Sequence, residues 1–258
     1  EMTTKAIEVL SRDEDGFFLM VEGGQIDWAG HGNDAGLMLH EMIKFDAAVR
    51  TVFNWAKGRD DTLVIITADH ETGGFGFSYS RSDVPEPTDL PGSAFEGRKY
   101  APNFNFGPLP ILDKLYAQKM SFFQIMQTFN AEKRRSAKTL MELVNANSAF
   151  PLSPEGAKAV LASEKNTYHI KDHTYLSAKT FPKVDDFEAF YVYGEDIRGD
   201  LIGRELATQQ NVVWATGTHT HTPVAVITYG PPSATEPFGD LLHHTELGQL
   251  AIQALGKP

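Results

Sequence analysis

The sequence predicts an α/β protein whose mostly parallel sheet is covered by helices on both faces. Two short apolar runs, residues 17–21 and 62–67, flank a long amphipathic segment at residues 35–57. Short apolar runs after turns are typical of buried strands, and the order strand, helix, strand is typical of parallel sheets. Residues 211–258 continue this pattern, so we expect one core made of residues 1–79 and 211–258.

Each element of this core follows from the hydrophobic pattern. A helix is expected at residues 2–10, and the runs 17–21 and 62–67 are expected to be fully buried strands. Further strands are expected at residues 212–216 and 224–229, before a last helix near 238–255. The long helix should bury a stripe of apolar residues, namely Leu39, Met42, Ile43, Phe45, Val49, Val52 and Phe53.

Residues 80–210 interrupt the core and are expected to be an inserted accessory region. Prolines are frequent between Pro85 and Pro110, which favours an extended surface excursion. Helical patterns follow at residues 112–129, 133–145 and 154–163, and residues 185–209 should end in a helix.

Composition limits the function. The formal net charge of −11 disfavours binding to nucleic acid, and no apolar run is long enough to span a membrane. The absence of cysteine excludes thiolate metal sites and cysteine nucleophiles. The chain opens with Glu1 inside a helical pattern, without a capping residue, an initiator methionine or a signal peptide, so we expect a fragment or a processed product.

Metal-binding side chains follow the first predicted strand. Glu22 comes directly after it, and Asp27 and His31 are four residues apart, which places them on one face if this segment is helical. The alternative is that Asp27 caps the following helix and His31 lies on the surface.

Two other strand ends carry similar side chains. Asp69 and His70 follow the run 62–67, and the alternative there is an exposed turn without a ligand. His219 and His221 precede the run 224–229 and project to the same side of an extended chain, so either could be a ligand. Ligands of open α/β sheets bind at the carboxyl ends of strands.

Other candidates are weaker. His169 and His173 lie in the irregular region, His40 is expected on a helix surface, and His243 with His244 is expected to start the last helix. Trp28 has an ordinary packing role as its alternative. No nucleotide-binding glycine pattern is present.

Together these residues predict a hydrolase with several metal ions. Asp27, His31 and one of His219 or His221 supply the three ligands of a catalytic zinc. Asp69 and His70 would begin a second site, and Glu22 offers oxygen ligands suited to magnesium. Two metals about 4 Å apart are the usual arrangement for displacement at phosphorus.

At these residues the sequence resembles the bacterial alkaline phosphatases. The matching stretches are residues 17–31, 62–70 and 217–231, and the resemblance covers about 1–79 and 211–258. Residues 80–210 look like the insert of marine-type members such as those of Vibrio, where it contributes to contacts between subunits.

The resemblance implies a role for each residue. Asp27, His31 and His219 match the ligands of a first zinc, with His219 preferred to His221. Asp69 and His70 match ligands of a second zinc, Glu22 matches a magnesium ligand, and Trp28 falls beside the phosphate site. The implied reaction is hydrolysis of phosphate monoesters through a phosphoserine, in a periplasmic or secreted homodimer.

The sequence also departs from the family pattern. It has no Asp-Ser pair, so the serine nucleophile is absent, as are the bridging aspartate and the phosphate-binding arginine. We therefore expect the C-terminal half of an alkaline phosphatase, whose partner is the missing N-terminal half. Two alternatives are a related two-metal phosphodiesterase or phosphomutase, and a catalytically silent, metal-bound interaction module.

Overall fold

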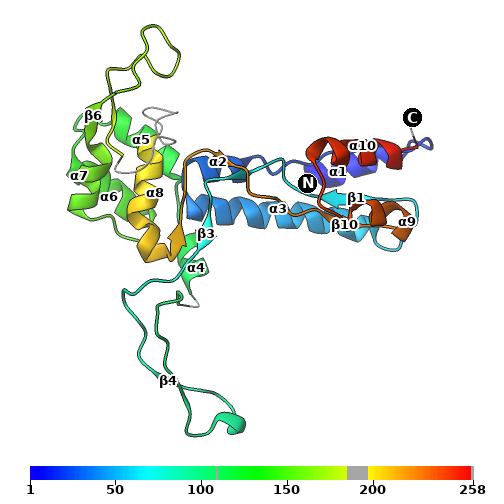
Figure 1. Cartoon of the computed structure of the whole chain (residues 1–258), viewed down its shortest axis with the longest axis horizontal. Coiled ribbons are helices and arrows are strands. Elements are labelled where there is room, and N and C mark those ends of the chain that lie inside the picture. Colours follow the sequence, from blue (N-terminus) through cyan, green and yellow to red (C-terminus); the bar gives the residue numbers. More distant parts are fainter. Residues whose placement is uncertain (109, 185–196, 257–258) are drawn as a thin grey trace. The chain divides into compact units, whose positions relative to one another are not determined.

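The computed structural model describes residues 1–108, 110–184 and 197–256 (Figure 1). The helices are α1 (Met2–Leu10), α2 (Gln25–His31), α3 (Ala35–Ala56), α4 (Ile111–Tyr116), α5 (Phe122–Ala131), α6 (Ala137–Asn147), α7 (Pro154–Leu161), α8 (Ile197–Gln210), α9 (Pro232–Thr235) and α10 (His244–Ala254), with short 3-10 helices η1 (Ser93–Phe95) and η4 (Glu236–Phe238). The strands are β1 (Val64–Ile66), β2 (Glu71–Thr72), β3 (Gly76–Phe77), β4 (Thr88–Asp89), β5 (Lys99–Tyr100), β6 (Ser163–Lys165), β7 (Thr180–Pro182), β8 (Val212–Val213), β9 (His219–Thr220) and β10 (Ile227–Tyr229). None of the described helices combines the length and the hydropathy needed to cross a membrane.

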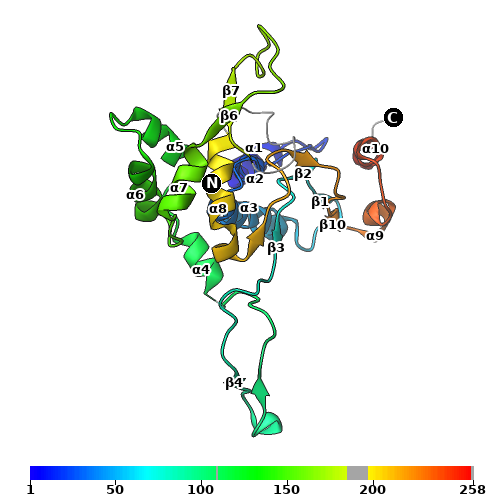
Figure 2. The same cartoon turned by 60° about the vertical axis from the view of Figure 1, so that its left-hand side comes forward.

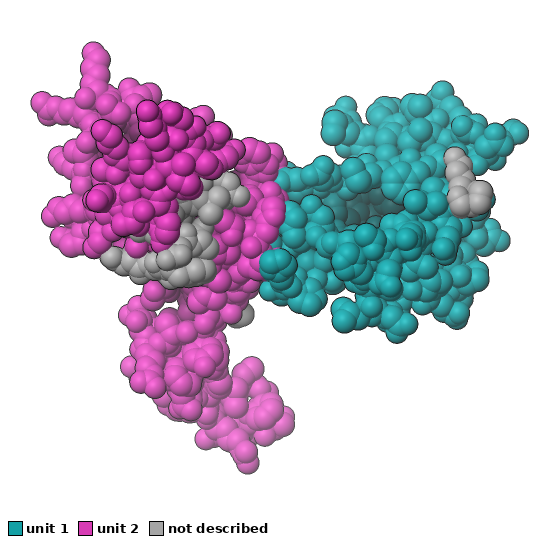
Figure 3. All heavy atoms as spheres, turned by 45° about the horizontal axis from the view of Figure 1, so that its top comes forward, with its two compact units in different colours: residues 1–24, 41–71, 221–258 teal, residues 25–40, 72–220 magenta. Residues whose placement is uncertain are grey.

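These elements form two compact units (Figure 3). Unit 1 comprises residues 1–24, 41–71 and 221–258, and unit 2 comprises residues 25–40 and 72–220. Unit 2 thus contains the whole range of the predicted insert, residues 80–210, together with residues 25–40 and 72–79. The proposed boundaries of the insert, at residues 80 and 210, stay a prediction.

The strands are short and pair two by two, in the orders β1-β10, β2-β9, β3-β8, β4-β5 and β6-β7. Four of these pairs, β1-β10, β3-β8, β4-β5 and β6-β7, run antiparallel. The parallel pairing expected from the order strand, helix, strand is therefore not found in these four. No described strand includes residues 17–21, which corrects that prediction, because a strand needs a hydrogen-bonded neighbour.

Unit 1 is built on part of α3 and the β1-β10 pair. The ring of Phe53 on α3 lies 4.9 Å from that of Tyr229 on β10. The three residues of β1 are only partly buried, so the prediction of a fully buried strand is wrong. The predicted apolar stripe of α3 is also wrong at Met42, Ile43 and Phe53, which are exposed. Few described side chains of unit 1 cover these surfaces, since its buried hydrophobic residues are Ile7, Ala56 and Phe238.

Unit 2 has a large apolar core formed by its helices (Figures 1 and 2). Phe122 and Ile125 of α5, Leu140 of α6 and Ile202 of α8 are all fully buried in it. The sequence predicted one helix over residues 112–129, whereas the structure has two, α4 and α5. Ser121 begins α5 through a reciprocal capping box with Gln124, which accounts for the interruption.

Two thin extensions leave this helical core, one containing β4 and β5 and the other β6 and β7 (Figure 2). All residues of β4 and β5 are exposed. The helix expected near the end of residues 185–209 is confirmed as α8, while residues 185–196 lie outside the described residues.

Candidate metal centre

Helix α2 brings two predicted ligands together. Asp27 and His31 lie one turn apart on it, and Oδ1 of Asp27 is 3.5 Å from Nε2 of His31. Asn33 follows the helix in the left-handed conformation with φ of 44°, which short amide side chains tolerate. Its side-chain amide donates hydrogen bonds to the carbonyls of Gly30 and Thr216, both within unit 2. The turn after α2 is therefore fixed to the segment that leads to His219.

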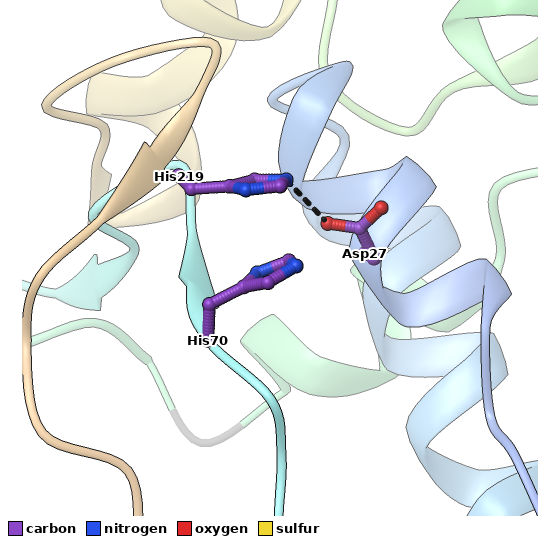
Figure 4. A group of neighbouring side chains, drawn as sticks. All are labelled: Asp27, His70 and His219. Atoms are coloured by element: carbon purple, nitrogen blue, oxygen red, sulfur yellow. Dashed lines mark ion pairs between the residues drawn. The ribbon is translucent and has the colours of Figure 1, made fainter. Parts of the chain in front are cut away.

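His219 reaches the same place from β9. The N–H of Gly73 donates to the carbonyl of Thr218 at 2.9 Å, which holds this strand beside the chain that follows β2. Nε2 of His219 lies 3.0 Å from Nε2 of His31 and 3.6 Å from Oδ1 of Asp27. Figure 4 shows the side chains of His219 and Asp27 pointing toward one another.

A backbone carbonyl fixes the proton of His31. Nδ1 of His31 lies 2.8 Å from the carbonyl oxygen of Gly217. A carbonyl oxygen can only accept, so Nδ1 carries the hydrogen and donates it. In the neutral ring this leaves a lone pair on Nε2, the atom that faces Asp27 and His219.

Thr72 orients the carboxylate. Its hydroxyl donates to Oδ1 of Asp27 at 2.6 Å, across 45 residues of sequence. Thr72, Asn33 and the Gly217 carbonyl also support the site and were not among the residues expected from the sequence. Their only sequence signal was proximity to the three predicted strand ends, because nothing in the chain pattern pairs residues so far apart.

The triad of Asp27, His31 and His219 has dimensions that fit zinc. Tetrahedral zinc with bonds of about 2.0–2.2 Å places neighbouring ligand atoms about 3.3 Å apart. The three ligand atoms here are separated by 3.0, 3.5 and 3.6 Å. Two nitrogens and one carboxylate oxygen also match the ligand types that zinc prefers. With three protein ligands, such a site keeps a fourth position for water or substrate.

The other predicted donors belong to unit 1. Oδ2 of Asp69 lies 3.3 Å from Nε2 of His70, and the Asp69 side chain is 87% exposed. Glu22 is exposed. His70, also drawn in Figure 4, precedes β2 directly in the chain. His221 begins the last segment of unit 1, and Trp28, on α2 of unit 2, is exposed.

Several weaker candidates have structural roles. Nδ1 of His173 accepts the backbone N–H groups of Tyr175 and Leu176, which forms a tight turn. The side chain of His243 caps α10, as expected for a helix start. His40 stacks on Tyr116 at a centroid distance of 4.2 Å.

Asp34 is a buried carboxyl group next to the site. Burial raises its pKa above the ordinary value, against hydrogen bonds that lower it. Its two oxygens accept from the N–H of Leu37, the side-chain amide of Gln118 and the N–H of Phe122. Asp34 thus joins the N-termini of α3 and α5, where partial positive charge favours a carboxylate.

Comparison with known proteins decides the family. A model of the alkaline phosphatase family matches residues 1–256. This chain belongs to the alkaline phosphatase family. Alkaline phosphatase 3 of Bacillus subtilis is 29% identical over 258 residues, and Escherichia coli alkaline phosphatase is 47% identical over 70 residues, which make up 27% of this chain and 15% of that protein.

Solved structures agree on the fold. The alkaline phosphatase of Thermus thermophilus matches with a TM-score of 0.70 at 21% identity, covering 100% of this chain and 47% of its own. The cold-active alkaline phosphatase from a psychrophilic Shewanella matches with a TM-score of 0.61 at 21% identity, covering 98% and 49%. The predicted α/β class and the predicted family are confirmed, whereas the closer resemblance to the Vibrio type stays a prediction.

The chain spans less than half the length of the alkaline phosphatases that it matches along its whole length. The Bacillus subtilis match covers 99% of this chain but 43% of that protein.

Proposed function

We propose that this chain is the zinc-binding part of an alkaline phosphatase and that the whole protein hydrolyses phosphate monoesters through a phosphoserine. The observation that carries the proposal is the triad of Asp27, His31 and His219, whose ligand atoms lie 3.0–3.6 Å apart. Family membership supplies the class of reaction. The geometry supplies a reason for this chain to contain metal ligands.

Zinc in the triad would supply a Lewis acid and a bound water whose pKa lies near neutrality. The residues of the chain prepare this chemistry. The Gly217 carbonyl holds the proton of His31 on Nδ1, so that Nε2 keeps its lone pair for a metal ion. Thr72 turns Oδ1 of Asp27 toward the two imidazoles. We assign the contact with the phosphate ester to Trp28, which directly follows Asp27 and is exposed.

We extend the proposal to a second zinc, bound by Asp69 and His70, and a magnesium ion, bound by Glu22. Asp27, His70 and His219 each offer one ligand atom of a kind that zinc takes. Asp69 and His70 are adjacent in the chain, and Oδ2 of Asp69 lies 3.3 Å from Nε2 of His70, which supports a shared second site.

We propose that the serine nucleophile comes from a part of the enzyme that this sequence does not contain. This sequence contains no Asp-Ser pair, and it spans 43% of the length of its Bacillus subtilis relative. Unit 1 exposes Phe18, Met20, Met42 and Ile43, which a further layer of protein would cover. We propose that the N-terminal half of the enzyme covers them and brings the serine. We also propose that the whole enzyme is a homodimer that acts in the periplasm or outside the cell.

Zinc binding and turnover test the proposal separately. The chain is stripped with a chelator, reloaded and analysed for bound metal, and we expect zinc to be retained after gel filtration. The full-length enzyme is then assayed on a chromogenic phosphate monoester and on the matching diester.

We expect chelator-sensitive turnover that prefers the monoester, and none from the chain without its upstream half. Preference for the diester would favour a phosphodiesterase. Bound zinc without turnover of either ester by the full-length protein would favour a silent metal-bound module. A chain that retains no zinc would contradict the proposal.

A further inference from the structure

Helix α8 brings a buried carboxylate to the back of the triad, within unit 2. Asp200 lies on this helix and is 4% exposed. A Cβ atom added to Gly217 would collide with Oδ2 of Asp200, so the carboxylate lies directly against the α-carbon of Gly217. Gly217 is the residue whose carbonyl accepts the Nδ1 hydrogen of His31. Gly217 therefore connects the Asp200 carboxylate to His31, a predicted zinc ligand.

The same face of α8 makes a second close contact. Gly203 follows Asp200 by three residues, a spacing that places both on one face of a helix. A Cβ atom at Gly203 would collide with the carbonyl oxygen of Asn33, which belongs to the turn after His31. The amide of Asn33 in turn donates to Thr216, directly before Gly217. One helix face thus supports both chain segments that position His31.

Two other charged side chains of α8, those of Arg198 and Glu205, have contacts away from Gly217. The guanidinium of Arg198 donates to the carbonyls of Val160 and Ala162, at 2.6 and 3.1 Å. Glu205 is exposed, and its carboxylate lies beside Gly156 of α7. Asp200 is the acidic group of α8 that is both buried and directed at Gly217.

We propose that Asp200 is a positioning residue of the zinc site: its carboxylate holds the Gly217 peptide in the orientation that fixes the His31 proton on Nδ1. His31 then presents Nε2 to the metal. The inference deepens the proposed function and rests on zinc binding by the triad. Groups that orient histidine ligands typically change metal affinity by about 10- to 100-fold when they are removed.

The test compares Asp200→Asn with Glu205→Gln in the full 258-residue chain. Both substitutions remove one negative charge from α8, but only the first touches Gly217. Zinc affinity is measured by competition with a chromophoric chelator. We expect about 10-fold weaker binding for Asp200→Asn and an unchanged affinity for Glu205→Gln. Equal affinities in the two variants and the wild type would overturn the inference.

A second readout does not depend on metal. The imidazole nitrogen-15 shifts of His31 in the metal-free chain report which nitrogen carries the proton. We expect Nδ1–H in the wild type and in Glu205→Gln, and a mixture of tautomers in Asp200→Asn. An unchanged tautomer in Asp200→Asn would contradict the role of the carboxylate. If the wild type binds no zinc, the proposed function fails, whereas the tautomer measurement still decides the effect of Asp200 on His31.

Gly217→Ala tests the same contact from the other side, and it serves if Asp200→Asn does not fold. The added methyl group would displace the Asp200 carboxylate, so zinc binding should again weaken by about 10-fold. In Asp200→Ala the space for this methyl group is open. The double variant should therefore bind zinc no more weakly than Asp200→Ala alone, and additive losses would overturn the inference.

Discussion

Unit 2 and unit 1 contain similar metal-binding side chains but hold them differently. In unit 2, the ligand atoms of Asp27, His31 and His219 lie within 3.6 Å of one another, and hydrogen bonds from Thr72 and to Gly217 orient two of them. In unit 1, the predicted ligands Glu22 and Asp69 are exposed.

The difference follows the apolar cores. The triad belongs to the unit whose helices bury an extensive core, whereas the described buried hydrophobic residues of unit 1 are Ile7, Ala56 and Phe238. A packed core fixes backbone segments, and fixed segments can hold polar side chains in one arrangement. In this chain the ligand atoms are therefore held most firmly in the unit that also supplies their supporting layer.

The largest effect should come from truncating the apolar core of unit 2, compared with an exposed ring of unit 1. Phe122→Ala in unit 2 removes a fully buried ring, and we expect the free energy of unfolding to fall by about 3–5 kcal/mol. Phe18→Ala in unit 1 removes a ring that is 65% exposed, so a change below about 0.5 kcal/mol is expected. Urea unfolding followed by circular dichroism measures both. Equal losses would break the comparison between the units.

Removing a ligand should be nearly as severe for metal binding. We expect His219→Ala to weaken zinc binding by more than about 100-fold, because the site loses one of three protein ligands. His221→Ala is the matched control, two residues away and in unit 1, and it should bind zinc as the wild type does. Isothermal titration with zinc distinguishes them. A larger loss of zinc affinity in His221→Ala than in His219→Ala would identify His221, and not His219, as the zinc ligand.

The buried carboxyl of Asp34 should matter for stability. In Asp34→Asn one acceptor oxygen becomes a donor, so either the N–H of Phe122 or the donors from Leu37 and Gln118 lose their partner. An unpaired buried group costs about 1–3 kcal/mol. Chemical unfolding of the variant measures this, and unchanged stability would show that the junction between α3 and α5 is not fixed by Asp34.

The stability difference between the wild type and Asp34→Asn should depend on pH, because burial raises the pKa of Asp34. The folded chain binds this proton more tightly than the unfolded chain does. Wild-type stability relative to Asp34→Asn should therefore increase as the pH falls from neutrality toward the ordinary carboxyl pKa of 3.8, and become constant below it. Parallel unfolding series of the two proteins measure the difference, which should not increase with rising pH.

The smallest effect is expected from the support of Asp27. Thr72→Val removes the hydroxyl that donates to Oδ1 of Asp27, and we expect about 10-fold weaker zinc binding. Thr128→Val is the control, because the Thr128 hydroxyl donates to a carbonyl of its own helix. Competition with a chelator measures both. Equal affinities would show that Asp27 is oriented by α2 alone.

The part of the metal site that is formed by residues close together in the sequence could be predicted. The spacing of Asp27 and His31 required only a helix, and α2 provides it. The pairing of Thr72 with Asp27, and of Gly217 with His31, could not be predicted because it depends on contacts across 45 and 186 residues. The break between α4 and α5 was readable, since Ser121 and Gln124 have the spacing of a capping box. Burial of β1 and residues 17–21 was overestimated because hydrophobicity alone does not say what covers a strand.

The contacts of α8 also set a limit on shortening this protein. Residues 80–210 look removable in the sequence, yet a deletion of all of them would take away Asp200 and Gly203, the two contacts behind His31. The extension that contains β4 and β5 is different, because its strand residues are all exposed. A minimal version of the chain should therefore be trimmed at that extension and should keep α8.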